Sequence, residues 1–187
     1  MKKLFGLSAL LVLFALPTLA QDTDTPVFEV GGGYAYRSFN VPAHSRLNMN
    51  GWELSGDYNV NNWLGVAGEF DGTRSDTGGL NWVYSYTFGP QFYPVGHHRL
   101  TPYVNFLLGG AHYSLSGCGG GGCSFTQNSF AFGGGGGLDL TLTSHIAARL
   151  GQLEYERTSF FDAGSNGTPY QQNFKFSMGL IVRFGQK

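Results

Sequence analysis

The chain has 187 residues, of which 30 are Gly, 16% are aromatic and only 12% are charged, with a formal net charge of −1. So much Gly argues against a helical bundle, because each helical Gly costs about 1 kcal/mol relative to Ala, and so many aromatic residues argue against disorder. The small net charge excludes the basic field that holds nucleic acid, so we expect a single all-β domain without a nucleic-acid partner.

The first twenty residues have the features of a secretory signal peptide. Lys2 and Lys3 form a basic start, residues 4–16 are almost entirely apolar, and small residues lead to a cleavage site after Ala20. The apolar stretch is too short to cross a bilayer as a helix. We expect residues 1–20 to direct export and to be removed. Residues 21–26 would then be a short periplasmic lead-in to a domain over residues 27–185.

From Phe28 onward, apolar and polar residues alternate with the two-residue period of a β-strand. The alternating segments are 28–37, 52–58, 64–71, 80–89, 129–141 and 173–184. Two more segments, 102–114 and 146–158, are strand-like, but it is ambiguous which of their faces is apolar. Eight strands are therefore predicted, several of them long enough to cross a membrane at a tilt, which takes about nine to eleven residues.

The predicted connections between these strands are alternately short and long. The short turns lie at 61–62, 95–99 and 143–144, and the longer connections at 40–48, 75–79, 116–126 and 159–170. Outer-membrane barrels have short periplasmic turns and longer extracellular loops. The alternation therefore favours a barrel whose two termini lie in the periplasm.

Two local features lie inside predicted strands. Pro90 cannot donate to a strand ladder, so it predicts a bulge or an early end of its strand. The run Gly133–Gly137 resembles a phosphate-binding loop, but it lacks the Lys-Ser/Thr pair and the following helix of that motif. We expect these glycines to let a curved barrel wall bend or to admit a bulky side chain from inside.

A closed eight-stranded sheet can place its apolar face in two opposite ways. A soluble lipocalin-like barrel turns that face inward around a small molecule, whereas a membrane barrel turns it outward to lipid. The polar face here consists largely of small residues, which suit a crowded barrel interior, and aromatic residues lie near strand ends as in an interfacial girdle. These aromatic residues are Tyr36, Phe39, Trp52, Trp63, Trp82, Phe92, Tyr93 and Phe184. The prediction is an eight-stranded antiparallel up-and-down transmembrane β-barrel, with a soluble periplasmic small-molecule-binding barrel as the alternative.

The polar face carries ten charged residues, and the apolar face carries none. The ten are Glu29, Arg37, Glu53, Asp57, Glu69, Asp71, Asp139, Arg149, Lys175 and Arg183. Because an eight-stranded interior is just wide enough for side chains to fill it, we expect these charges to pair in a filled lumen. The alternative is a narrow pore that prefers cations, since acids outnumber bases.

The chain resembles the small outer-membrane β-barrels of Gram-negative bacteria, the OmpA-like and porin-family barrel domains, over almost all of 27–185. The most specific element is the final strand, which fits the family's insertion signal at Ser177, Gly179, Val182 and Phe184, although three residues follow the terminal aromatic. The resemblance implies recognition by the barrel-assembly machinery and periplasmic chaperones. It also implies residence in the lipid of the outer membrane and a structural, surface-interaction or minor pore role, with the partner of the outer loops left open.

The remaining candidates lie in or near an expected outer loop. Cys118 and Cys123 are separated by four flexible glycines, and exported proteins meet an oxidising environment, so we expect a disulfide. Two thiolates fall short of the four ligands of a zinc site. His112 with Ser114 or Ser116 is the one nearby His–Ser pair suited to an enzyme at the outer leaflet. Since such pairs are common, we expect no catalytic residue, no metal and no cofactor.

Overall fold

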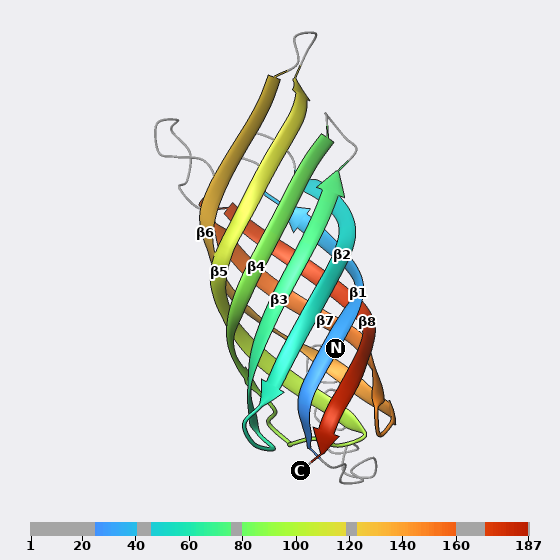
Figure 1. Cartoon of the computed structure of the whole chain (residues 1–187). Helices are drawn as coiled ribbons and strands as arrows, with labels where there is room; N and C mark the ends of the chain where they lie inside the picture. The colour runs from blue at the N-terminus through green and yellow to red at the C-terminus, as the bar shows by residue number, and fades with distance from the viewer. Residues whose placement is uncertain (1–24, 41–45, 76–79, 119–122, 160–170, 187) are drawn as a thin grey trace, which may run out of the picture.

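The computed structural model describes residues 25–40, 46–75, 80–118, 123–159 and 171–186, so the predicted signal peptide and most of the lead-in lie outside the described residues. Eight strands close into one barrel, each antiparallel to the next, with the last pairing back to the first (Figure 1). They are β1 (Pro26–Phe39), β2 (Leu47–Asn59), β3 (Leu64–Ser75), β4 (Leu80–Phe92), β5 (Leu100–Cys118), β6 (Cys123–Thr143), β7 (Ile146–Thr158) and β8 (Gln171–Gln186). The predicted fold is confirmed. Among the described residues, no helix is long and apolar enough to cross a membrane.

The three short connections lie together at one end of the barrel, called the turn end here, and the opposite end is called the loop end. In the β2–β3 turn, the Asn61 side chain accepts hydrogen bonds from the backbone N–H groups of Trp63 and Leu64 at 3.0 and 2.8 Å, an arrangement that Asn favours. In the β4–β5 turn, Gly96 adopts a φ of 74°, which glycine reaches without strain. Local turn chemistry thus fixes the hairpins at this end.

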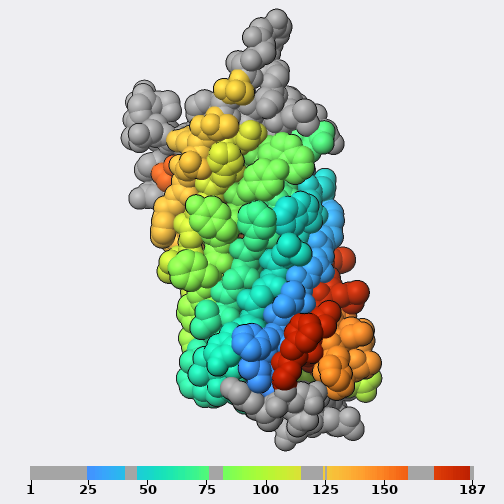
Figure 2. Space-filling model, viewed as in Figure 1, coloured from blue at the N-terminus to red at the C-terminus, as the bar shows by residue number. Residues whose placement is uncertain are grey.

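The two faces of the wall differ as the alternation predicts. Rings and aliphatic side chains cover the outside (Figure 2), for example Phe106, which is 62% exposed, while the side chains facing the interior are mostly polar and buried. A soluble small-molecule-binding barrel would have the opposite arrangement, so that alternative is wrong. Six of the eight aromatic residues expected in the girdles lie on the outside, but Phe39 and Tyr93 do not. Phe39 has inward-facing strand parity, Tyr93 directly follows the end of β4, and both are buried inside the barrel.

The two ambiguous segments now have definite faces. On β5 the odd residues such as Asn105 point inward and the even ones such as Phe106 outward. On β7 the register with β8 shifts between Arg149 and Gln152, so that Leu150 and Gly151 both lie between two inward-facing residues. This bulge reverses the parity within one strand, which explains why no single alternation fitted the segment.

Pro90 causes neither a bulge nor an early strand end, so that expectation is wrong. Strand β4 continues to Phe92, and its register with β3 passes through Pro90 without a shift. On the β5 side, pairing stops after Phe88 and resumes at Gln91 in the same register. The missing N–H of Pro90 is therefore accommodated by a local gap in one ladder.

The expected outer loop over 116–126 is largely strand. Strands β5 and β6 contain 19 and 21 residues, against 12 to 16 in the other six, and they pair up to Cys118 opposite Cys123. The two strands project beyond the rest of the barrel at the loop end (Figure 1). The prediction failed because this stretch is rich in Gly and Ser and has no apolar face from which to recognise a strand.

Candidate functional site

At the turn end, the interior begins with a polar layer around Glu29. Arg183 donates to Glu29 through Nε at 2.6 Å and to the Thr141 hydroxyl through Nη1 at 2.6 Å. The ring of His97, from the β4–β5 turn, packs against the Tyr93 ring at a tilt of 45°, with 4.2 Å between centroids. Burial lowers the pKa of His97 below its usual value. This layer closes the turn end with a neutral His and an ion pair.

The next layer is organised by Arg149. Its guanidinium contacts Asp139 at 3.1 Å, lies 3.9 Å from Asp57, and donates to Gln152 Oε1 at 2.8 Å. It also lies over the face of the Tyr103 ring, 4.8 Å from the centroid, in the geometry of a cation–π contact. The Tyr103 ring fits there because Gly137 faces it, where an added Cβ would collide with the hydroxyl.

Lys175 occupies the middle of the lumen and has four carboxylate neighbours. Its Nζ lies 2.7 Å from Glu69, 2.7 Å from Glu154, 2.8 Å from Glu53 and 3.4 Å from Asp71. Neutral side-chain amides also donate hydrogen bonds to two of these carboxylates. Gln152 and Asn105 each donate to Glu69 and Glu154, at distances between 2.7 and 3.3 Å. One ammonium and two amides thus hold together carboxylates from several strands.

Arg37 forms the last charged layer before the loop end. It is fully buried and donates to Asp71 at 2.6 Å, to Glu156 at 2.8 Å and to the Ser85 hydroxyl at 2.6 Å. These partners come from β3, β7 and β4, whereas Arg37 itself is on β1. The pairs therefore cross the lumen instead of following its wall.

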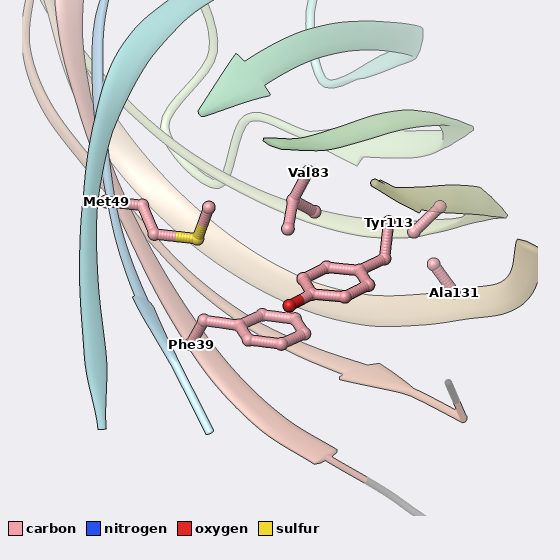
Figure 3. Close-up of a cluster of buried hydrophobic side chains, with 6 residues drawn as sticks. Phe39, Met49, Val83, Tyr113 and Ala131 are labelled. Carbon is pink, nitrogen blue, oxygen red and sulfur yellow. The ribbon is translucent and has the colours of Figure 1, made fainter. Parts of the chain in front are cut away.

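An apolar cluster covers the charged layers on the loop side. It consists of Phe39, Met49, Val83, Ala111, Tyr113 and Ala131, all buried inside the barrel, and it is called the apolar cap here. The Phe39 and Tyr113 rings are stacked with 6.0 Å between centroids and 3° between planes. Figure 3 shows the side chains of Met49 and Val83 pointing toward these rings from the surrounding wall. Phe39 lies two residues beyond Arg37 on β1, so the cap seals the lumen directly above the ion pairs.

All ten charges expected in the lumen are buried there, together with Glu154 and Glu156. Sequence reasoning missed these two carboxylates because the β7 bulge reverses the parity of their strand. Among the described residues, the interior holds eight carboxylates and four bases. Hollows beside Glu53 and Arg149 and beside Glu154 and Glu156 measure only about 10 Å³, room for about one water.

A family model for the outer membrane protein beta-barrel domain matches residues 6–184. The chain belongs to this family. Its members are integral proteins of the outer membrane, so the turn end is periplasmic and the loop end extracellular.

Solved structures of other small outer-membrane barrels share the fold. Neisserial surface protein A has a TM-score of 0.65 at 16% identity, over 84% of this chain and 97% of that one. Ail, the attachment invasion locus protein of Yersinia pestis, has 0.61 at 22% identity, over 88% and 100%. OprG from Pseudomonas aeruginosa has 0.54 at 14% identity, over 88% and 99%. No curated protein matches the chain.

In this outer-membrane barrel, the residues of the expected insertion signal lie along β8. Ser177 faces the interior and is buried, whereas Val182 and Phe184 are exposed on the lipid-facing side. Gly179 lies opposite Gly33 of β1, where an added Cβ would collide with the backbone of β1. The glycine therefore permits β8 and β1 to approach closely where they close the barrel. Recognition of this residue by the barrel-assembly machinery stays a prediction.

The expected disulfide and the His–Ser pair belong to the projecting hairpin. The backbones of Cys118 and Cys123 lie opposite each other. The structure describes only the backbone of these two residues, so the disulfide stays a prediction. His112 Nδ1 lies 2.7 Å from Asn128 Oδ1 on the neighbouring strand, so this ring nitrogen contacts an amide. In the described part of the chain, no three His, Cys, Asp or Glu residues form a metal-holding group.

Proposed function

We propose that this outer-membrane protein is a closed, non-conducting and non-enzymatic barrel that presents the β5–β6 hairpin at the cell surface. The observation that carries the proposal is the filled lumen. Arg37 and Lys175 cross-link carboxylates from several strands, and the apolar cap covers them on the extracellular side. A barrel without an aqueous path transports nothing through its interior, so its external function falls to the segments above the membrane.

The projecting hairpin supports a role in surface contact. It continues beyond the other strands while the lumen below it is sealed. Of the similar structures, one is named a Neisserial surface protein and another an attachment invasion locus protein. The proposal also includes removal of residues 1–20 after export and a Cys118–Cys123 disulfide at the hairpin tip. It further includes insertion of the barrel into the outer membrane by the barrel-assembly machinery, which would recognise β8.

The competing role is a narrow cation-preferring pore, which the excess of interior carboxylates favours. Fixed charges alone do not conduct, because ions also need a continuous hydrated path. The ion pairs, the apolar cap and the small size of the interior hollows all oppose such a path.

Cysteine labelling of whole cells tests the surface role. In a background with both native cysteines changed to Ser, Asn128→Cys places a thiol on the outer face of the hairpin, and Ser144→Cys places one in a periplasmic turn. A membrane-impermeant maleimide is expected to label Asn128→Cys in intact cells and Ser144→Cys only after lysis. Labelling of both variants only after lysis would contradict surface presentation.

A further inference from the structure

The charged side chains on the outside of the barrel are arginines. In the described part of the chain, every Asp, Glu and Lys is buried in the lumen, together with Arg37, Arg149 and Arg183. The charged residues that are not buried are Arg46, Arg74, Arg99 and Arg157. Within the described residues, the outer surface therefore carries positive charge only, although the whole chain has a formal net charge of −1.

Three of these four arginines lie at the loop end, close to the ends of their strands. Arg46 directly precedes β2, Arg74 is the penultimate residue of β3, and Arg157 is the penultimate residue of β7. The residues on either side of Arg74 and of Arg157 are buried, whereas the arginines are not, so both side chains point outward. Arg99, by contrast, lies in the β4–β5 turn at the periplasmic end.

Each of the three guanidinium groups at the loop end packs over an aromatic ring of another strand, within the range of a cation–π contact. The distances from Cζ to the ring centroid are 5.2 Å for Arg46 over Phe174, 5.6 Å for Arg74 over Trp82 and 5.9 Å for Arg157 over Phe132. These rings lie on the outward face of β8, β4 and β6. Because aromatic girdles mark the two boundaries of the apolar band, the contacts hold the three positive charges at its extracellular boundary.

Arginine at this boundary has the chemistry that recognises phosphate. The planar guanidinium binds a phosphate group through two parallel N–H bonds. Its five donors let it contact a phosphate in addition to a protein acceptor, such as the Ser38 hydroxyl, which lies 3.3 Å from Arg46 Nη1. Anionic lipids carry phosphate in their headgroups and attract Lys and Arg side chains near the membrane surface.

We propose that Arg46, Arg74 and Arg157 bind the phosphate groups of anionic lipid in the outer leaflet of the outer membrane. The inference requires only that the loop end is extracellular, so it does not depend on what the β5–β6 hairpin contacts. A soluble anionic polymer would approach from the water above the membrane. The three guanidinium groups instead lie against lipid-facing rings, at the level where lipid headgroups meet the apolar band.

Lipid binding by the full-length refolded barrel in zwitterionic detergent micelles tests this proposal. The probe is lipid A, compared with the same lipid after enzymatic removal of its phosphate groups, and thermophoresis of the dye-labelled protein gives the two dissociation constants. We expect the phosphorylated lipid to bind about tenfold more tightly or better, since each Arg near a charged membrane surface adds to the attraction. Raising the salt concentration is expected to reduce this preference, because salt screens exposed charges.

Substitutions at the two ends of the barrel locate the binding. The triple variant Arg46→Gln, Arg74→Gln, Arg157→Gln removes the three charges at the loop end and is expected to bind both forms of the lipid equally. Arg99→Gln is the matched control, because it removes an exposed charge at the periplasmic end, and it is expected to keep the full preference. Arg46→Gln alone is expected to lower the preference in part. A gel mobility shift between heated and unheated samples verifies that each variant folds.

Several outcomes overturn the proposal. Equal affinity of the wild type for the two forms of the lipid would show that phosphate is not recognised. A preference that the triple variant keeps would place the phosphate site elsewhere, and an equal loss in Arg99→Gln would reduce the effect to net charge. Displacement of the lipid by inorganic phosphate at the same phosphate concentration would show that the arginines take a free anion. Tighter binding of soluble heparin than of lipid A would identify an extracellular polymer as the occupant.

Discussion

The lumen and the projecting hairpin are built from the same antiparallel strands but satisfy their polar groups in opposite ways. In the lumen, charged side chains from different strands meet, so that Lys175 alone contacts four carboxylates. The projecting hairpin has no Asp, Glu, Lys or Arg from 112 to 128, and backbone pairing between β5 and β6 joins its two strands. This chain therefore concentrates its charged contacts where they close the barrel and relies on backbone pairing where the hairpin projects above it.

The largest effect is expected from removing the central cation. Lys175→Met leaves Glu53, Glu69 and Glu154 without their shared ammonium, and breaking a buried ion pair by removing one partner costs about 3–5 kcal/mol. We expect a large loss of folded protein, measured by urea titration of the refolded barrel in detergent micelles. Lys175→Arg keeps the charge and is the matched control.

A variant that fails to fold would leave the cause of this loss open, so a compensating pair is needed. Adding Glu69→Gln and Glu154→Gln to Lys175→Met removes the uncompensated charge and is expected to recover part of the stability. A triple variant that is no more stable than Lys175→Met would show that electrostatic pairing is not what holds the middle of the lumen together.

The apolar cap is expected to show the next largest effect. Phe39→Ala opens a cavity beside Tyr113, and buried Phe→Ala substitutions typically cost about 3–5 kcal/mol. Phe106→Ala is the matched control, because that ring faces lipid and is 62% exposed, so its removal leaves no internal cavity. Unfolding midpoints in urea compare the two, and an equal loss in both variants would contradict a packed cap.

A smaller, pH-dependent effect is expected at the periplasmic end. Burial lowers the pKa of His97 in the folded state below its ordinary 6.5, despite Glu29 at 4.0 Å. The unfolded chain then binds the proton first, so the contribution of His97 to stability is present above pH 6.5 and is lost as the pH falls. The stability difference between wild type and His97→Gln is therefore expected to shrink from pH 8 to pH 5, and a difference that grows instead would contradict the buried neutral state.

The smallest effect on stability is expected in the hairpin. Asn128→Lys changes an exposed side chain of β6, and exposed substitutions usually change stability by less than about 0.5 kcal/mol. Urea titration measures this effect, and a large loss of stability would show that the hairpin braces the barrel.

The fold and most of the charged residues of the lumen could be predicted from the sequence, because both follow from the two-residue period of side chains along a β-strand. Sequence reasoning missed Glu154 and Glu156 because one bulge at Leu150 reverses the parity of β7. In the sequence, such a bulge shows only as a segment in which neither set of alternating residues is consistently apolar. Phe39 and Tyr93 were predicted to belong to an interfacial girdle because they are aromatic residues near strand ends. In the structure, both are buried inside the barrel. The extension of β5 and β6 into 116–126 was also out of reach, because this Gly- and Ser-rich stretch has no apolar alternation that would predict strand pairing.

The electrical conductance of the refolded wild-type barrel in a planar lipid bilayer shows most directly whether the lumen is closed. With ion pairs across the interior and the apolar cap above them, we expect no stepwise current at high salt. Regular cation-selective current steps from the wild type, reduced when Glu53 and Glu69 are changed to Gln, would show instead that the excess carboxylates line a hydrated pore.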